Sequence, residues 1–183
     1  YSKDWRGRIN EKALCVVFPK NQDEVSKILK FCYDNDIKVI PQGGNTNLVA
    51  SASPSKEKKE IIINMEKINQ IHHIDILNKC VEVDAGVKID DLNTRLEKDG
   101  FFFPLEMAST GSSQVGGVIS TNAGGINVLH YGSVRNNLLG LDVVLSNGKI
   151  LRLGSKVVKD NTGYNLKDLF CGSEGTLGII TRA

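Results

Sequence analysis

The stretch MASTGSSQVGGVISTNAGGINVL, from Met107 to Leu129, contains no charged side chain, and its Gly, Ser, Thr and Asn residues are interleaved with single apolar residues. A second charge-free stretch of the same kind is PQGGNTNLVASASPS, from Pro41 to Ser55. A third glycine-rich stretch is GSEGTLGII, from Gly172 to Ile180. Glycine lets the backbone approach a ligand closely. Exposed backbone N–H groups in such turns bind anions without Lys or Arg. We therefore predict that the three stretches form one pocket of main chain, suited to a long dinucleotide.

The chain has 183 residues, enough for one domain or for two small lobes that share a ligand. It carries 23 basic and 21 acidic residues, a balance that argues against a nucleic-acid partner. The run SKEKKE, from Ser55 to Glu60, mixes both signs and is predicted to be a solvated turn. No apolar run approaches the ~20 residues of a transmembrane helix. Because the chain begins at Tyr1 without Met, we expect a fragment or a processed form.

The cysteines predict free thiols. Cys15, Cys32, Cys80 and Cys171 are widely spaced, form no C-x-x-C pair and lie among apolar residues. We expect buried thiols in a reducing compartment rather than a disulfide framework or a metal site.

The order of predicted elements indicates an α+β chain with two lobes, roughly 1–66 and 72–183, whose loops face one cleft. Apolar runs and alternation predict strands at Leu14–Phe18, Lys38–Pro41, Ile61–Asn64, Gln70–Leu77 and Lys79–Ala85, a hairpin of Leu139–Leu145 with Lys149–Leu153, and a strand after Gly178. One apolar face of Val25, Ile28, Leu29 and Cys32 predicts a helix from about Gln22 to Tyr33, capped by Asn21. Further helices are expected from Ile89 to Gly100, where the glycine ends the helix, and near Asn165–Phe170. Phe101–Phe103 is either a strand or a buried loop.

The glycine loops do not follow the common nucleotide-binding patterns. A G-x-G-x-x-G sequence that opens a helix directly after a strand is absent, and so is G-K-[ST]. In QGGNTNL, Gly43 and Gly44 would allow close approach to a pyrophosphate, while Asn45, Thr46 and Asn47 would add neutral donors; an ordinary tight surface loop is the equal alternative. In GSSQVGGVISTNAGG, paired glycines flank a small apolar turn, which is either a close-packed crossing between the lobes or a wall beside a flat ring.

Four motifs together resemble the FAD-binding domain of the FAD-linked oxidases. They are PQGGNTNLV, STGSSQVGGVISTNAGG, HYGSVRNNLLGLDVVLSNGKIL and KDNTGYNLKDLFCGSEGTLGIIT, and they cover nearly the whole chain in order. The resemblance implies the two-lobed α+β fold of vanillyl-alcohol oxidase and p-cresol methylhydroxylase, with FAD between the lobes. Within this superfamily the chain is most similar to the D-2-hydroxy-acid dehydrogenases, and DWRG, from Asp4 to Gly7, with KDNTGYNLK favours the D-2-hydroxyglutarate type over the D-lactate and glycolate types.

The resemblance also implies cofactor contacts. The pyrophosphate would lie on the first loop, the diphosphate, ribityl chain and ring along the second, and the adenosine at the third. The residues implied are Pro41, Gly43, Gly44, Asn45, Thr46, Asn47, Ser51, Gly111, Ser112, Ser113, Gly116, Gly117, Asn122, Gly124, Gly178 and Ile180. We expect Val at Gly44 to fill the phosphate space and abolish FAD binding while leaving most of the secondary structure. Leu at Gly117 should do the same near the ring while also risking the fold.

Two positions depart from the family pattern. Asn47 stands where the family often has a second glycine, and Ala50-Ser51 replaces a glycine pair. The resemblance therefore does not predict the structure of the end of this loop. Asn tolerates positive φ better than most residues. Relatives that bind FAD covalently have a His where this chain has Asn45, so we predict non-covalent, dissociable FAD.

The three histidines and Arg135 are candidates for metal, flavin or anion contacts. His72 and His73 lie in a predicted strand without further nearby ligands, so no metal site is expected. His130 would either approach the flavin or make a structural hydrogen bond, and the structural role is favoured. Arg135 is either a surface residue or part of an anion site.

Catalytic residues are not identified. Oxidation of a 2-hydroxy acid requires a base and a cationic clamp for the carboxylate, and no such cluster is found. In the resembled enzymes these groups come mainly from a cap domain and a C-terminal segment, which we expect this chain to lack.

The resemblance implies an FAD-binding module of a D-2-hydroxy-acid oxidoreductase with an unknown electron acceptor. The alternatives are a flavoenzyme of the UDP-N-acetylenolpyruvoylglucosamine reductase type and a non-catalytic remnant. The expected location is cytoplasmic, with peripheral attachment to the inner membrane, or mitochondrial in a eukaryote.

Overall fold

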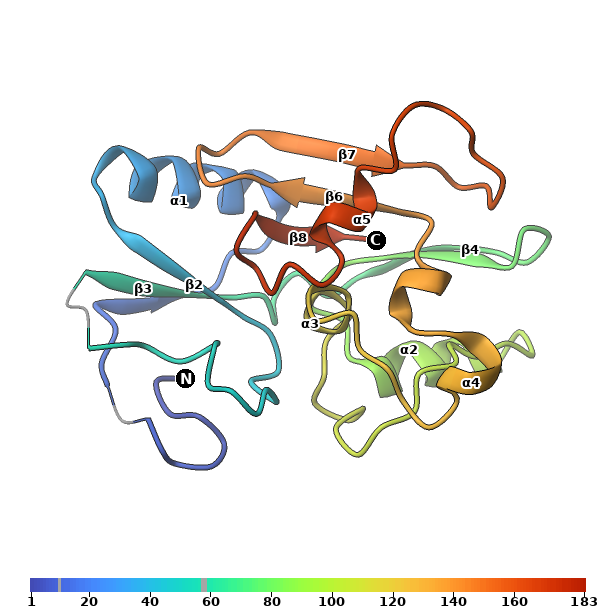
Figure 1. Cartoon of the computed structure of the whole chain (residues 1–183), viewed down its shortest axis with the longest axis horizontal. Coiled ribbons are helices and arrows are strands. Elements are labelled where there is room, and N and C mark those ends of the chain that lie inside the picture. The colour runs from blue at the N-terminus through green and yellow to red at the C-terminus, as the bar shows by residue number, and fades with distance from the viewer. Residues whose placement is uncertain (10, 57–58) are drawn as a thin grey trace.

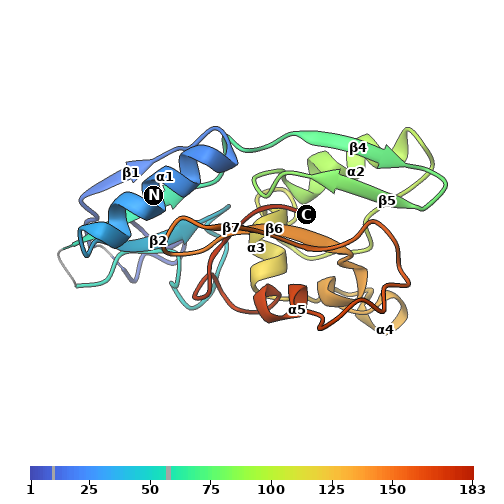
Figure 2. The same cartoon turned by 90° about the horizontal axis from the view of Figure 1, so that it is seen from above.

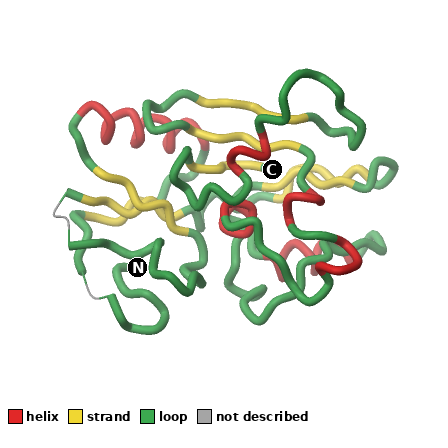
Figure 3. The backbone as a smooth tube through the Cα atoms, in the orientation of Figure 1, coloured by secondary structure: helices red, strands yellow, loops and turns green. Residues whose placement is uncertain are grey.

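The computed structural model describes residues 1–9, 11–56 and 59–183. Strands, short helices and long loops alternate along the chain, and the strands form three small sheets ordered β1-β3-β2, β4-β5 and β7-β6-β8 (Figure 1, Figure 3). The strands are β1 Cys15–Val17, β2 Lys38–Gln42, β3 Glu60–Asn64, β4 Ile71–Asp75, β5 Cys80–Val83, β6 Gly140–Val144, β7 Ile150–Gly154 and β8 Ile179–Arg182. The helices are α1 Gln22–Asp34, α2 Ile89–Glu97, α3 Val115–Ser120, α4 Val128–Tyr131, the 3-10 helix η1 Val134–Asn137 and α5 Lys167–Phe170.

The first sheet is parallel and has β3 at its centre. Ile62 of β3 lies opposite Val16 of β1 on one side and Ile40 of β2 on the other. All five residues of β3 are buried, as expected for a continuous apolar run in the middle of a parallel sheet. The predicted strands and the β-α-β order of this part are therefore confirmed, and β2 leads directly into the first glycine loop.

Helix α1 begins and packs as predicted. The Asn21 side chain caps it by accepting a 2.9 Å hydrogen bond from the backbone N–H of Glu24. Val25, Leu29 and Cys32 on its apolar face are buried. The helix contacts both β2 and β6, and Ser26 donates a 2.6 Å hydrogen bond to the carbonyl of Gly148 in the β6–β7 turn, which lies beside α1 (Figure 1, Figure 2). Helix α1 therefore joins the first sheet to the third.

The remaining predicted elements are present. The β6–β7 hairpin turns over residues 146–148, and β8 pairs antiparallel with β6. Helix α2 buries Ile89, Leu92 and Leu96 and is followed by Gly100 at φ +75°, the expected left-handed glycine. Phe101–Phe103 is a loop. Most of the buried apolar residues form one continuous cluster through all three sheets, and Ile40 and Ile62 are buried outside it. The division into lobes at residues 66 and 72 stays a prediction.

The small apolar turn predicted between the glycine pairs is instead helix α3. Two glycines in six residues make this helix unfavourable by intrinsic propensity. It is held by tertiary hydrogen bonds, because the N–H of Val115 donates to the carbonyl of Val87 and the N–H of Gly116 to that of Ala85, at 2.9 and 2.8 Å. These partners lie 28 and 31 residues earlier in the chain, so no local sequence pattern could indicate them.

The structure corrects the predictions for the cysteines and for the run from Ser55 to Glu60. All four cysteines are free, but Cys15 is exposed and Cys80 half-buried, so the prediction of four buried thiols is wrong. Glu60 is not part of a solvated turn, because it is buried and accepts 2.7 Å hydrogen bonds from the N–H and hydroxyl of Ser55; residues 57–58 of the predicted turn lie outside the described residues. None of the helices described is long and apolar enough to cross a membrane.

We expect the Asn21→Ala variant to lower the free energy of unfolding by about 1 kcal/mol, because the N–H of Glu24 loses its side-chain acceptor. Asn21→Ser, which keeps a capping oxygen, should stay within a few tenths of a kcal/mol of the unsubstituted chain. Urea unfolding followed by circular dichroism measures both. Equal losses in the two variants would contradict a capping role for Asn21.

Candidate functional site

The three glycine-rich stretches meet at one groove of about 350 Å³. The first wall follows β2, the second consists of α3 and the loop before it, and the third precedes β8. The residues that line it are Pro41 to Leu48, Ser51, Ala52, Met65, Ala85, Met107, Ser109, Ser113, Gln114, Gly116 to Val118, Ser120, Thr121, Ala123, Glu174, Gly175 and Gly178 to Ile180. The predicted convergence of the three loops on one pocket is therefore confirmed.

Residues 43–52 turn sharply to form the first wall. Asn45 adopts φ +52° and its amide donates a 2.8 Å hydrogen bond to the carbonyl of Lys3. The Asn47 side-chain oxygen accepts a 2.9 Å hydrogen bond from the N–H of Ser51 and thereby closes the end of the loop. Ala50 adopts φ +60°, a conformation that costs a non-glycine residue about 1–2 kcal/mol. The left-handed positions are thus Asn45 and Ala50, and Asn47 stabilises the loop through its side chain.

The first and second walls are in direct contact. A methyl group on Gly44 would lie 1.8 Å from the carbonyl oxygen of Ser112, so the two backbones touch at this point. The hydroxyls of Thr46 and Ser113 lie 3.2 Å apart and join the same walls. At the beginning of α3, a methyl group on Gly116 would lie 2.7 Å from Cβ of Ala85. These glycines are therefore required for packing.

The third wall is anchored to the end of α3 and to β2. The N–H of Glu174 donates a 2.8 Å hydrogen bond to the carbonyl of Ser120. Gly175, at φ +79°, packs against Pro41, whose Cγ would lie 2.6 Å from an added methyl group. The third stretch is thus fixed to both other walls by backbone contacts.

The groove is nearly free of charge. Among the described residues that line it, Glu174 is the one that carries a formal charge, and neither Lys nor Arg is present. Three polar side-chain atoms of the lining are buried without a hydrogen-bond partner: Oδ1 of Asn45, Nδ2 of Asn47 and Oε1 of Gln114. Because a buried polar atom without a partner costs about 1–3 kcal/mol, these atoms indicate a polar ligand that supplies both donors and acceptors.

Twelve of the sixteen predicted contact residues line the groove, and four lie beside it. Gly111 is exposed next to Asp90, and Gly124 is exposed next to Val128. Ser112 presents its carbonyl to Gly44. The Asn122 side chain accepts a 3.0 Å hydrogen bond from the N–H of Arg135, which commits it to holding η1. The cofactor contacts of all sixteen residues stay predictions.

The sequence did not single out several lining residues, above all Met65, Ala85, Met107 and Gln114. Met65 and Ala85 follow β3 and β5, and their place at the groove depends on how the sheets are arranged. Gln114 is 5% exposed and reaches across to Gly43. Its position two residues before the Gly116–Gly117 pair in a charge-free stretch was the one available signal.

Arg135 and the histidines have structural surroundings outside the groove. The Arg135 guanidinium donates to the backbone carbonyls of Asp168, at 2.7 Å, and of Cys171, so it fixes the end of α5 rather than an anion. His72 lies 2.7 Å from a carboxylate oxygen of Asp84. His130 packs edge-on against Tyr131, with ring centroids 4.4 Å apart.

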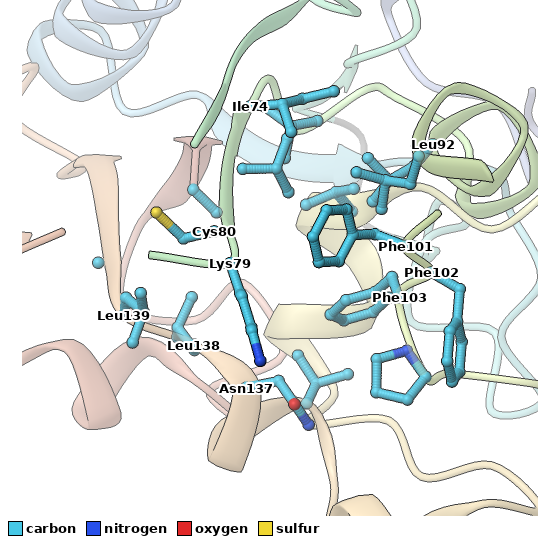
Figure 4. Close-up of a pocket in the computed structure, with 18 of the residues that line it drawn as sticks. Ile74, Lys79, Cys80, Leu92, Phe101, Phe102, Phe103, Asn137, Leu138 and Leu139 are labelled. Carbon is cyan, nitrogen blue, oxygen red and sulfur yellow. The ribbon is translucent and has the colours of Figure 1, made fainter. Parts of the chain in front are cut away.

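A second cavity of about 340 Å³ shares α3 with the groove. Val115 and Ile119 of α3 face it, while Gly116 and Gly117 face the groove. Figure 4 shows Leu92, Phe101 and Phe103 on one side of it and Leu138 and Leu139 on the other. This cavity contains none of the predicted contact residues, so the groove is the candidate site.

The comparisons with known proteins agree with this geometry. The family model of the FAD binding domain matches residues 13–154. The chain belongs to this FAD-binding domain family. The cofactor of this family is FAD, and the groove fits it, because glycine backbone and neutral donors surround a space that leaves three buried polar atoms without partners.

Relatives of this FAD-binding domain match almost the whole chain. D-2-hydroxyglutarate–pyruvate transhydrogenase DLD3 of Saccharomyces cerevisiae is 42% identical over 181 residues, covering 99% of this chain and 36% of the relative. Mitochondrial D-2-hydroxyglutarate dehydrogenase of Arabidopsis thaliana is 41% identical over 179 residues, covering 98% of this chain and 32% of the relative. The chain therefore spans about a third of the length of these curated relatives.

A solved structure of alkyldihydroxyacetonephosphate synthase superposes with a TM-score of 0.81 at 28% identity, covering 92% of this chain and 30% of that one. The predicted α+β FAD-binding fold of the p-cresol methylhydroxylase type is confirmed. The family resemblance inferred from the four motifs is likewise confirmed.

The structure reverses the expected behaviour of two glycines in this FAD-binding domain. Valine at Gly44 would collide with the Ser112 backbone, so the expectation that it fills the phosphate space while sparing the fold is wrong. A methyl group on Gly117 would meet no atom within 4 Å and would point into open space. Gly117 is therefore the better probe of the groove.

We expect Gly117→Ala to raise the free energy of unfolding of the cofactor-free chain by up to about 1 kcal/mol, because Ala is the better helix former. The same methyl group enters the groove, so the Kd for FAD should rise severalfold. Urea unfolding and an FAD titration measure the two effects. Gly44→Ala is the matched control and should lower stability; an unchanged or lower Kd in Gly117→Ala would contradict this wall of the groove.

Proposed function

We propose that this chain is the FAD-binding part of a dehydrogenase that oxidises a D-2-hydroxy acid, with D-2-hydroxyglutarate as the first candidate. The observation that carries the proposal is the match of 97–99% of the chain to proteins named D-2-hydroxyglutarate dehydrogenase or transhydrogenase, at about 40% identity. A relative from Schizosaccharomyces pombe, 41% identical, bears the name of a D-lactate dehydrogenase, so D-lactate is the second candidate. Bound FAD supplies the acceptor for the hydride that leaves the hydroxyl-bearing carbon.

The residues of the groove bind and orient the cofactor in this proposal. The unpartnered amide nitrogen of Asn47 is a donor for the diphosphate, and the unpartnered oxygens of Asn45 and Gln114 are acceptors for hydroxyl or ring N–H groups. The backbone of Gly43 and Gly117 allows close approach. Met65 and Ala85 supply an apolar surface against the rest of the cofactor.

The groove of this chain does not supply the groups that act on the substrate. A 2-hydroxy acid needs a base for its hydroxyl proton and a cation for its carboxylate. Neither His, Lys nor Arg is present among the described lining residues. We therefore propose that the groove positions the cofactor and that groups outside it bind the substrate.

The lining also supports dissociable FAD. Asn45 carries an amide, and the described lining residues include neither His, Cys nor Tyr as a point of covalent attachment. For a eukaryotic source, the word mitochondrial in the names of several relatives supports a mitochondrial location over a cytoplasmic one.

We expect the purified chain mixed with FAD to show a flavin absorption spectrum shifted from that of free FAD. Acid denaturation followed by filtration should release all flavin into the filtrate, because no covalent bond holds it. Yellow colour that stays with the precipitated polypeptide would contradict non-covalent binding. An unshifted spectrum at saturating FAD would contradict the groove as the cofactor site.

We expect this chain to support substrate oxidation when it replaces the aligned third of the yeast transhydrogenase. D-2-hydroxyglutarate should then bleach the flavin absorption of the hybrid under anaerobic conditions, and the L enantiomer is the matched control. A hybrid that binds FAD and bleaches with NADPH alone would favour a reductase. A hybrid that binds FAD and bleaches with neither compound would favour a non-catalytic flavin-binding module.

A further inference from the structure

The segment of residues 1–9 contacts the first wall of the groove from outside. The carbonyl of Tyr1 accepts a 2.8 Å hydrogen bond from the side chain of Gln42, and that of Lys3 accepts one of the same length from Asn45. The Arg8 guanidinium donates at 2.5 Å to the carbonyl of Leu48. The three contacts fall at the end of β2 and in the first half of the loop 43–52, and the two segments lie side by side in Figure 1.

The segment holds its own shape through Asp4. This carboxylate is 3% exposed, accepts a 2.8 Å hydrogen bond from the N–H of Ile9 and lies 3.4 Å from Nε of Arg8. The N–H of Gly7, at φ +68°, donates to the Asp4 carbonyl at 2.9 Å. The hydrogen bond from Ile9 lowers the pKa of Asp4, with a smaller contribution from Arg8, so the carboxylate is charged at neutral pH. Residues 4–9 therefore form a closed loop that presents Arg8 to Leu48.

The cofactor loop needs such external support. It follows the edge strand β2 and contains two non-glycine residues in the left-handed region, Asn45 and Ala50. Its inner surface must stay free for the ligand. Hydrogen bonds that hold its conformation therefore have to come from the side of the loop that faces away from the groove. Gln42, which is 1% exposed, and Asn45 both use their side-chain amides for this purpose. None of residues 1–9 lines the groove.

We propose that residues 1–9 are a positioning clip for the FAD-binding loop, in which Asp4 orients Arg8 and Arg8 fixes the loop at Leu48. The clip contributes to FAD affinity without contact with the cofactor. The inference rests on the assignment of the groove to FAD. It assigns a role to a segment that the matched family region, residues 13–154, does not include.

Arg8→Gln is the variant that tests the clip, and Arg6→Gln is its matched control. Both arginines belong to the same segment and both substitutions remove one positive charge, but Arg6 lies over the exposed Trp5 ring, 5.3 Å from its centroid. We expect Arg8→Gln to weaken FAD binding about tenfold, the size expected for a lost charge-assisted hydrogen bond. Arg6→Gln should bind as the unsubstituted chain does.

ADP separates positioning of the loop from general destabilisation. ADP carries the diphosphate and lacks the flavin, so a displaced phosphate loop should weaken ADP and FAD by the same factor. The thermal midpoint of the cofactor-free chain should change little, while backbone amides of residues 43–52 should exchange with deuterium faster in Arg8→Gln than in Arg6→Gln. Asp4→Asn, which keeps an acceptor for Ile9 and loses the ion pair with Arg8, should give an intermediate Kd.

Each outcome decides between the hypotheses. Equal FAD affinities for Arg8→Gln, Arg6→Gln and the unsubstituted chain would overturn the clip and leave the groove intact. A weaker FAD affinity of Arg8→Gln with unchanged amide exchange in residues 43–52 would also overturn it. An unsubstituted chain that binds neither FAD nor ADP would overturn the groove assignment and, with it, the clip that depends on it.

Discussion

The contact between the backbones of Gly44 and Ser112 determines the form of the groove. An α-carbon at one position lies so close to a carbonyl at the other that no side chain fits between them. The first and second walls are consequently held edge to edge, and the groove lies between them and the third wall. Glycines also allow close packing against side chains, where Gly116 meets Cβ of Ala85 and where Gly178 meets Cγ1 of Val143. Glycine in this site mainly brings walls together, and the groove is the space that this packing leaves.

Neutral recognition of an anionic cofactor follows from this arrangement. Lys and Arg side chains are long and flexible, and ordering them costs conformational entropy. Backbone and short amide groups that are already fixed avoid much of that cost. Polar atoms that lack hydrogen-bond partners in the unliganded groove favour binding of a polar ligand. The arginines and lysines of the chain serve elsewhere: Arg135 fixes α5, Arg182 lies between Glu82 and Asp84, and Lys156 pairs with Glu82 and thereby lowers the pKa of that carboxyl.

Much of the fold could be predicted from local patterns. The Asn21 cap, the three isoleucines of β3 and the β6–β7 hairpin each have a short-range signature that the tertiary structure does not override. Helix α3 could not be predicted, because its stability depends on the carbonyls of Ala85 and Val87. The loops of the groove were identified from composition and from family resemblance. The roles of individual glycines were not, since composition does not distinguish Gly44, which packs against backbone, from Gly117, which faces open space.

The glycine contacts also restrict how this sequence can change during evolution. At Gly44, Gly86 and Gly125 even a single methyl group would come within 2.2 Å of a carbonyl oxygen, so steric exclusion alone forbids every other residue there. An invariant glycine at such a position among homologues would record backbone proximity and would carry no information about the ligand. Ligand-driven selection would instead be visible at positions where larger residues are sterically permitted, and Gly117 is the clearest such position in this groove.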